Sequence, residues 1–430
     1  MRNDILERRG IYDAAELGVP KMVLLGIQHT FAMFGATVLV PLLTGLDVGT
    51  TLLMAGLGTL LFHLLTRGRV PAFLGSSFAF LGGYQIVAPM LDGKPNTEML
   101  PYACGGVVCA GLLYLVMAAL MKFFGSEKVM RFFPPVVTGP IIIAIGLILA
   151  PSAIGNCSTN WPLALIALAA VLVFNLWGRG IVRLVPILLA ILVSYVAAVL
   201  MGAVDFTAVR EARLIGVAIH PAAFAKFEIS SIITIMPIAL ATMMEHIGDI
   251  CAISATTGVN YVENPGFHRT MLGDGLATSL SAMFGGPANT TYGENTGVLA
   301  LTGVYDPRVV RLAAYFAILL SFCPKFSAVI QTVPSAIIGG ISFVLYGMIS
   351  AVGLRNLVES KVDFSRSRNL LIAAVILVSA FGFNSIGGVS FVAAGTTVTL
   401  SGLAIAALAG ILLNAVLPLR ETAGEHETGN

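Results

Sequence analysis

The stretch GGPANTTYGENTGVLALTGV, residues 285–304, decides how this chain folds. It begins with small and β-prone residues and becomes helix-like only later, so it is not one apolar helix of the ~20 residues that cross a bilayer. A carboxylate, Glu294, lies at the change. Non-helical backbone inside a membrane survives only where protein or a watery cavity satisfies its polar groups. The stretch therefore predicts a polar centre inside a membrane bundle.

A second stretch of the same kind is VPAFLGSSFAFLGGYQIVAPM, residues 70–90. Its segment 76–83 matches 290–297 in residue type at most positions. We expect two short strands that pair with each other, followed by half-helices that begin near Ala79 and Glu294. The N-termini of these half-helices would aim free N–H groups and partial positive charge at the bundle centre.

Composition supports a membrane protein. Of the 430 residues, 57% are hydrophobic and only 11% charged, whereas soluble domains are roughly 45–50% apolar and about a quarter charged. The net charge of +2 does not indicate nucleic-acid binding. The five cysteines are scattered without metal-ligand spacing, so we expect neither a metal site nor a disulfide framework.

Apolar runs predict twelve spans, and the two broken segments raise the count to fourteen. The runs cover 22–43, 49–66, 103–121, 135–155, 161–177, 181–203, 229–255, 270–286, 309–323, 327–351, 369–385 and 394–418. With the N-terminus in the cytosol, only five of the 24 basic residues fall outside: Lys94, Arg210, Arg213, Lys226 and Lys325. This bias agrees with the positive-inside rule.

The two halves of the chain contain matching segments. Gln28-His29 lies in the first crossing, and Glu245-His246 in the first crossing after the long external loop. An odd number of crossings, seven, separates the matched elements, so the repeats should be inverted. Inverted repeats with paired interrupted segments indicate a transporter with a central site.

Acidic residues inside the spans are the candidate functional groups, because intramembrane carboxylates are costly. Glu245 and Asp249 are four residues apart and share a helix face. Both cannot comfortably ionise in a low dielectric, so one should hold a proton near neutral pH, as a proton carrier must. Glu294 opens a half-helix, and we interpret Asp274 as structural. His29 and His246 lie beside the matched sites.

At this point the chain resembles a known family. Glu294-Asn295-Thr296-Gly297 with Thr302, together with QHTFAMFGATVLVP (28–41), GSSFAF (75–80), EHIGD (245–249) and ESKVD (359–363), is similar to the nucleobase–ascorbate transporters (nucleobase:cation symporters), in particular their uracil permease branch. The resemblance implies an all-α polytopic fold of two inverted seven-segment repeats, with segments 3 and 10 each a short strand plus half-helix.

The resemblance also implies a division into moving parts. A core domain would comprise 22–134 (segments 1–4) and 229–324 (segments 8–11), and a gate domain 135–228 (segments 5–7 and the external loop) and 325–419 (segments 12–14). Tails at 1–21 and 420–430 would be cytosolic. The implied protein is a homodimer in the bacterial inner membrane that takes up uracil with a proton, with no other cofactor and no enzymatic activity.

The family's site residues transfer position by position. Those implied to bind substrate are Glu245, Glu294, Phe78, Gly293, Tyr292 and Ala36; those implied in proton coupling are Asp249, Glu245 and Tyr346; possible support comes from Gln28, His29, His246 and Asn295. Asp249 replaces a histidine of the uracil permease pattern, which leaves the proton carrier open. Glu294 favours uracil, because many purine-type members have glutamine there.

The chemistry of uracil agrees with this site. Its two N–H donors suit carboxylates, its two carbonyls suit half-helix N–H groups, and its ring face suits an aromatic wall such as Phe78 or Tyr292. Three alternatives stay open: a carrier of purines, other pyrimidines or ascorbate; an anion transporter of the same fold, which two acids disfavour; and an intramembrane aspartyl protease, for which Asp274 and Asp306 lack the usual glycine context. The sequence leaves open the proton stoichiometry, the oligomeric state and the conformation.

Overall fold

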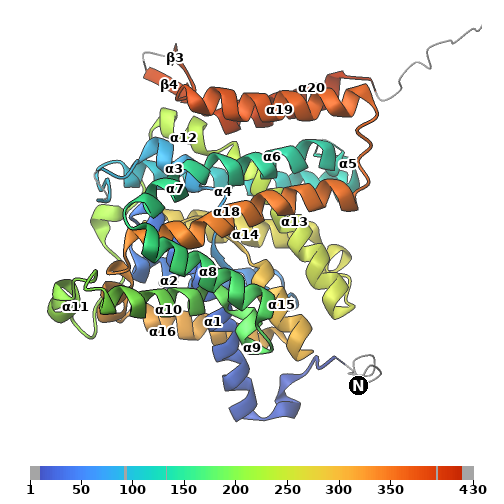
Figure 1. Ribbon diagram of the computed structural model, residues 1–430. Helices are drawn as coiled ribbons and strands as arrows, with labels where there is room; N and C mark the ends of the chain where they lie inside the picture. Colours follow the sequence, from blue (N-terminus) through green and yellow to red (C-terminus); the bar gives the residue numbers. More distant parts are fainter. Residues whose placement is uncertain (1–9, 92–93, 132, 394–395, 419–430) are drawn as a thin grey trace, which may run out of the picture.

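The computed structural model describes residues 10–91, 94–131, 133–393 and 396–418, and helices make up most of it (Figure 1). The α-helices are α1 (Val19–Thr44), α2 (Val48–Leu65), α3 (Leu81–Val87), α4 (Leu100–Phe124), α5 (Ser126–Met130), α6 (Pro135–Ile148), α7 (Ala150–Ser158), α8 (Trp161–Trp177), α9 (Ile181–Leu184), α10 (Pro186–Leu200), α11 (Thr207–Glu211), α12 (Ile229–Ile235), α13 (Ile238–Thr257), α14 (Phe267–Met283), α15 (Gly293–Thr302), α16 (Pro307–Ser321), α17 (Pro324–Gln331), α18 (Ser335–Glu359), α19 (Ser367–Ser385) and α20 (Gly402–Val416). Short 3-10 turns η1 (Ala14–Leu17) and η2 (Pro221–Ala223) and a π-turn η3 (Val262–Gly266) complete the helical set.

Four strands form two antiparallel pairs: β1 (Leu74–Ser76) with β2 (Asn289–Thr291), and β3 (Val389–Ala393) with β4 (Thr396–Leu400). The first pair joins the two broken segments, with Leu74 opposite Thr291 and Ser76 opposite Asn289. The expected pairing of these two segments is therefore confirmed. The half-helices α3 and α15 follow the strands, close to the expected starts.

The described residues contain seven helices long and apolar enough to cross a membrane, or eight if the bent pair α16–α17 counts as one span. Three shorter apolar helices, α8, α10 and α20, coincide with further predicted runs. Each predicted apolar run thus has a helix in the structure. The number of crossings and the inverted repeat stay predictions.

Proline divides several predicted spans into two helices. The run 135–155 is α6 followed by α7, with Pro151 in the first turn of α7. The run 229–255 is α12 followed by α13, with Pro237 just before α13. The run 327–351 covers the end of α17 and most of α18, with Pro334 just before α18. Proline has no N–H to donate and favours the first turn of a helix, so each span restarts at it.

The prediction of one helix over 394–418 is wrong at its N-terminal end. Residues 394–395 lie outside the described part, 396–400 form strand β4, and α20 begins only at Gly402. The reason is local: the sequence TTVTL is rich in β-branched residues, which favour strands, and the Ser401 side chain accepts from the backbone N–H of Ala404 and caps the helix.

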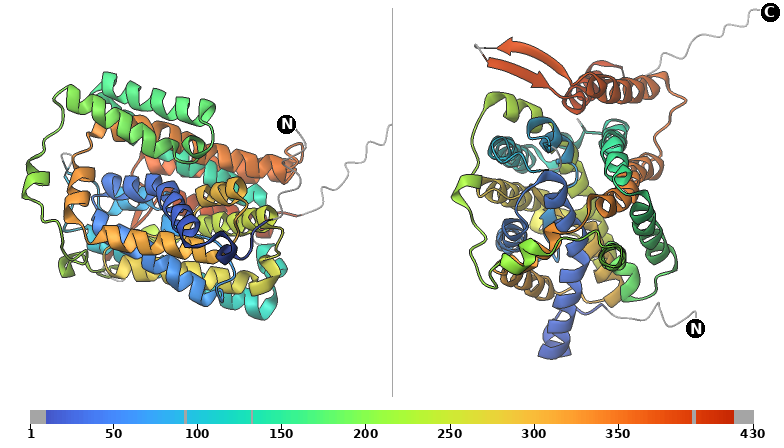
Figure 2. Two further views of the ribbon diagram at one scale, coloured as in Figure 1. Left: turned by 90° about the horizontal axis from the view of Figure 1, so that it is seen from below. Right: turned by 60° about the vertical axis from the view of Figure 1, so that its left-hand side comes forward.

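The helices pack in two groups. In one group α4 packs along α14, and α2 packs along α14 and α16; in the other, α18 packs on α6, α7 and α8, and α8 on α10. Helices α19 and α20 pack against each other and on α6. With the β3–β4 hairpin they form a layer along one edge of the molecule (Figures 1 and 2).

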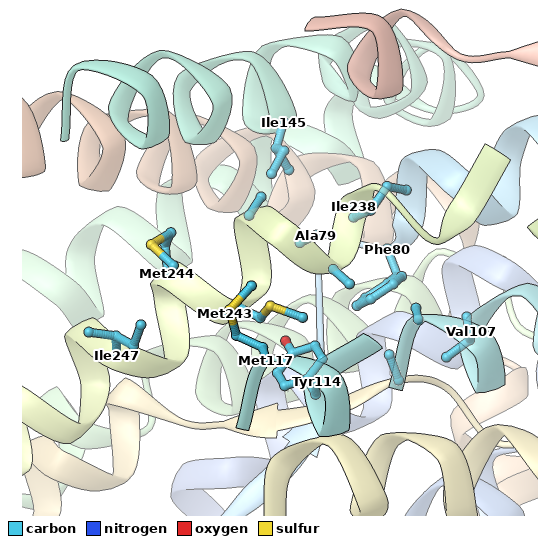
Figure 3. Close-up of a cluster of buried hydrophobic side chains, with 14 of the residues drawn as sticks. Ala79, Phe80, Val107, Tyr114, Met117, Ile145, Ile238, Met243, Met244 and Ile247 are labelled. Carbon is cyan, nitrogen blue, oxygen red and sulfur yellow. The ribbon is translucent and has the colours of Figure 1, made fainter. Parts of the chain in front are cut away.

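The largest buried cluster holds α13 in place (Figure 3). Met243 of α13 lies among the buried side chains that include Tyr114 and Met117 of α4. The Tyr114 hydroxyl donates to Oγ1 of Thr242 over 2.5 Å, also on α13. Apolar packing on one side of α13 leaves its opposite side for the acidic residues.

Candidate functional site

The β1–β2 pair at the centre of the molecule is supported from several helices. Thr59 of α2 accepts from the backbone N–H of Leu74 over 2.9 Å, and Thr278 of α14 donates to the carbonyl of Asn289. The Asn289 amide donates to the carbonyl of Met54 over 2.9 Å. These bonds satisfy backbone groups that a broken segment leaves free, and they fix the starting points of α3 and α15.

Asp249 and His246 of α13 reach this strand pair. Oγ1 of Thr291 donates to Oδ2 of Asp249 over 2.8 Å and lies 3.4 Å from Nδ1 of His246. Behind them, Nδ1 of His246 is 3.5 Å from Oδ2 of Asp274, to which Thr290 donates over 3.4 Å. His246 and Asp274 are fully buried. The side chains form a continuous polar chain from the strand pair into α14.

Glu245 and Glu294 are both exposed, unlike most of their neighbours. They lie close enough to interact electrostatically, as a shared site requires. Glu294 lies in the first turn of α15. The side chain of the N-cap residue, Tyr292, accepts no hydrogen bond from the backbone N–H groups of that turn. An open helix N-terminus beside two carboxylates offers donors and acceptors together.

A cavity of about 700 Å³ lies beside Glu294. Its walls come from α1 (Phe31, Ala32, Gly35), α15 (Glu294, Gly297, Ala300, Leu301), α8 (Val171, Asn175), α10 and the segment before it (Gly178, Arg179, Gly180, Arg183, Val185, Pro186, Ile187, Leu188) and α18 (Leu345, Met348). The cavity therefore lies between the two helix groups. Of the residues expected to bind substrate, Glu294 alone lines it.

Tyr292 and Gly293 lie where β2 becomes α15. The Tyr292 hydroxyl donates to the carbonyl of Ser76 over 2.9 Å and is 3.3 Å from Oγ1 of Thr37. These bonds hold the ring across the strand pair. A Cβ at Gly293 would lie 3.5 Å from Oδ1 of Asp249, which shows how closely the backbone approaches that acid. Phe78 is half-buried just after β1.

The remaining expected residues differ in their placement. His29 is buried, and its Nδ1 is 3.3 Å from the amide of Asn295. Gln28 is half-buried next to it. Tyr346 is buried in α18, and in the described part of the chain no hydrogen bond joins it to Asp249. Ala36 lies in α1, and its side chain is outside the described residues.

Sequence reasoning missed one contributor. Thr291 lies in the stretch 285–304 with which the sequence analysis begins, but its position beside Asp249 depends on a strand register that the sequence does not reveal. Asp274, which we interpret as structural, is fully buried, with Nδ1 of His246 and Oγ1 of Thr290 beside its carboxylate. The described residues contain no group of side chains suited to hold a metal ion.

This geometry agrees with what comparison with known proteins finds. The model of the permease family matches residues 20–386. This chain belongs to the nucleobase–ascorbate transporter family. Named relatives within the family are the uracil permease of Bacillus caldolyticus, 42% identical over 95% of this chain and 94% of the relative, and that of Bacillus subtilis, 39% identical over 91% of each. The putative pyrimidine permease RutG of Escherichia coli is 41% identical over 91% of this chain and 88% of the relative.

Solved structures confirm the fold of this nucleobase–ascorbate transporter. The transmembrane domain of the cyanobacterial bicarbonate transporter BicA superposes with a TM-score of 0.60 at 16% identity, covering 88% of this chain and 98% of that domain. The murine anion transporter Solute Carrier 26 family member A9 superposes with a TM-score of 0.65 at 12% identity, over 92% and 68% of the two chains. At such identities only the architecture is shared. With bacterial permeases as relatives and several apolar helices, the protein is a multi-pass bacterial membrane protein.

Proposed function

We propose that this protein takes up uracil together with a proton across the bacterial inner membrane, with both termini in the cytosol. The observation that carries the proposal is the pair Glu245 and Glu294, two interacting, exposed carboxylates beside the open N-terminus of α15. Named relatives at 39–42% identity are uracil permeases, which supports uracil as the cargo.

The two carboxylates suit a neutral ring with N–H donors. Glu294 and Glu245 would accept the two N–H groups of uracil, and the free N–H groups of α15 would donate to a carbonyl. Tyr292 and Phe78 would cover the ring face, as aromatic side chains do for flat ligands. The main chain of Gly293, close to Asp249, would meet the ring edge.

Proton coupling would belong to the acidic residues on α13. Asp249 interacts electrostatically with Glu245 and Glu294 and accepts from Thr291. Neighbouring carboxylates repel each other when both are ionised, so their titrations are coupled. Binding or release of one proton therefore changes the charge of the site that holds the substrate. We assign the proton to Asp249 or Glu245, and Tyr346 of α18 would meet Asp249 in another conformation.

Alternating access would move the core domain (segments 1–4 and 8–11) against the gate domain (segments 5–7 and 12–14). The 700 Å³ cavity between α1–α15 and α8–α10–α18 supports this division. Arg179 and Arg183 lie at this cavity and are exposed. Basic loop residues favour the cytosolic side, so we infer an inward-facing state. A homodimer, as the family resemblance implies, completes the proposal.

The decisive experiment replaces Glu294 by glutamine in purified protein. Glutamine removes the charge of Glu294 and replaces one of its two acceptor oxygens by an NH2 donor, which costs about 1–3 kcal/mol of binding, so we expect uracil affinity to fall roughly 5- to 150-fold. Isothermal titration measures the affinity, and size-exclusion chromatography confirms that the variant folds. Glu211→Gln, at an exposed residue of α11, is the matched control. Wild-type affinity in Glu294→Gln refutes the site.

The fold likeness to bicarbonate and anion transporters raises one competing cargo. Glu294 in the cavity wall, with Glu245 exposed on the neighbouring helix α13, repels an anion, which argues against it. Competition for uracil uptake by thymine, xanthine, ascorbate and sulfate in proteoliposomes separates the possibilities. Unlabelled uracil should inhibit the uptake of labelled uracil at a lower concentration than any of the other compounds. Stronger inhibition by xanthine than by uracil would make the protein a purine carrier.

A further inference from the structure

A second cavity, of about 540 Å³, lies between the two helix groups at the end opposite Arg179 and Arg183. We call it the outer vestibule, and it is lined by Pro41, Leu42, Leu43, Gly45, Leu46, Val48, Gln85, Pro89, Met90, Pro95, Ser152, Asn156, Gln331, Val333, Ser335 and Ile338. Its wall combines the end of α1 and the half-helix α3 with α7, α17 and the start of α18. Figure 1 shows α3 and α7 together at this end of the molecule.

Primary amides dominate the polar part of this wall. Gln85, Asn156 and Gln331 are partly or fully exposed, and hydroxyls of Ser152 and Ser335 lie among them. Gln85 donates from Nε2 to Oγ of Ser152 over 3.1 Å. The side chains of Asn156 and Gln331 make no hydrogen bond to another described residue. Two amides are therefore available to a ligand.

The lining selects for a neutral ligand. Among the described residues that line the vestibule no side chain is charged, whereas the cavity on the other side contains Glu294, Arg179 and Arg183. An ion that entered the vestibule would lose water without gaining a counter-charge, which is costly. A primary amide presents a donor beside an acceptor, so it pairs in a bidentate manner with an imide edge that carries N–H beside C=O.

The position of Gln85 links the vestibule to the central site. Gln85 lies on α3, the half-helix that continues from β1 through Phe78. Its bond to Ser152 joins α3 to α7, that is, one helix group to the other. In the proposed alternating access, sliding of one group against the other would break this bond.

We propose that the outer vestibule is a second, weaker binding site for a neutral nucleobase, which loads the central site from outside. Asn156 and Gln331 hold the imide edge, and the Gln85–Ser152 bond closes the floor until the core moves. This inference rests on the proposed function, because it takes the same ligand class. It differs from that function in requiring a site that does not include Glu294.

The test uses full-length protein that carries Glu294→Gln, so that the central site no longer dominates. Saturation-transfer NMR on the ring protons of uracil at millimolar concentration detects weak binding. We expect a signal in this protein and at least about a fivefold loss when Asn156→Leu and Gln331→Leu are added, since each change removes a hydrogen-bonding partner. Asn260→Leu, in the loop before η3, is the matched control and should leave the signal intact.

Uptake kinetics give an independent reading in otherwise wild-type protein. Asn156→Leu with Gln331→Leu should lower kcat/KM for uracil uptake about 3- to 10-fold, while the affinity of the solubilised protein measured by titration stays within twofold. No NMR signal in the Glu294→Gln protein, or a signal that the added changes leave intact, overturns the vestibule site. If Glu294→Gln binds uracil as tightly as the wild type, the central site is refuted instead. The uptake comparison of Asn156→Leu with Gln331→Leu then tests the vestibule site independently.

Discussion

Thr291 donates from Oγ1 to Oδ2 of Asp249 over 2.8 Å, across the boundary between strand β2 and helix α13. The same oxygen lies 3.4 Å from Nδ1 of His246. Because β2 leads directly into α15, this hydroxyl connects the backbone that carries Glu294 with the helix that carries Glu245. The two halves of the proposed site are thus held by one short side chain.

Replacing Thr291 by valine tests that connection. Valine keeps the β-branched shape that suits a buried strand, but it leaves Asp249 and His246 without the hydroxyl. A polar group left without its hydrogen bond costs about 1–3 kcal/mol, so proton-driven uracil uptake should fall by at least roughly fivefold. Uptake into proteoliposomes with an imposed pH gradient measures it. Thr291→Ser restores the hydroxyl and should recover most activity; equal uptake by the valine variant would dismiss the connection.

Asp249→Asn separates transport from its driving force. Asparagine keeps an acceptor for Thr291 but has no carboxylate to protonate. We expect uracil counterflow between the two sides of the membrane to continue, while accumulation against a concentration gradient is lost. Asp363→Asn, in an exposed turn between α18 and α19, controls for the change itself. Intact accumulation in Asp249→Asn would move the proton to Glu245.

Much of the fold can be predicted from the sequence because each signal is local. The small, β-prone residues before Ala79 and Glu294 predict the strands β1 and β2, and their pairing follows from the need to satisfy backbone groups in a membrane. The helix starts after Pro237 and Pro334 are also local signals, although the continuous apolar runs around these prolines concealed the breaks. The β3–β4 hairpin was missed because hydrophobicity alone does not separate a short strand from a helix.

The site can be predicted only in part, because its contacts join segments that are distant in the sequence. Charge in a span marks Glu245, Asp249 and Glu294, and family resemblance adds Tyr292 and Gly293. The contacts of these residues depend on register and packing between distant segments, as in the bond of His29 to Asn295. Nothing in the local sequence around Gln85 and Ser152 predicts that these two residues meet.

Close packing of α4 on α14 makes a prediction about stability. A Cβ added at Gly111 would lie 2.6 Å from the carbonyl oxygen of Gly275 and would also meet Ser279. Overpacking of this kind costs about 1–3 kcal/mol, so Gly111→Ala should lower the apparent melting temperature in detergent. Gly155→Ala on α7, where nothing lies within 4 Å of the new Cβ, should match or exceed the wild type. Equal apparent melting temperatures of the two variants would show that α4 and α14 move apart at little cost to admit the added Cβ.

The contacts of the N-terminal segment with Gly303 and Asp306 lead to a prediction about pH. Ile11 donates to the carbonyl of Gly303 and Ala14 donates to Oδ2 of Asp306, over 2.8 and 2.7 Å. Burial opposes the charge of Asp306, but hydrogen bonds from Arg308 and Ala14 keep the pKa of this carboxyl below its ordinary value. The stabilisation is therefore complete above the ordinary pKa near 4 and disappears as the pH falls through the lowered pKa.

Asp306→Asn should remove this stabilisation at pH 7 and change little once the pH is below the lowered pKa of Asp306. Asparagine can keep the cap on α16 through its one oxygen, but it lacks the charged second oxygen that accepts from Ala14, and a lost hydrogen bond to a charged group costs about 1.5–3 kcal/mol. Hydrogen exchange of the peptide covering residues 10–18, corrected for intrinsic rates, should then be roughly 10- to 150-fold faster at neutral pH. Asp205→Asn, at an exposed residue between α10 and α11 whose hydrogen bonds go to Thr207, should leave the exchange of this segment unchanged. If the variant and the wild type exchange alike at pH 7, the carboxylate of Asp306 does not hold the N-terminal segment, and apolar packing of Ala14 against Val304 and Val309 must do so.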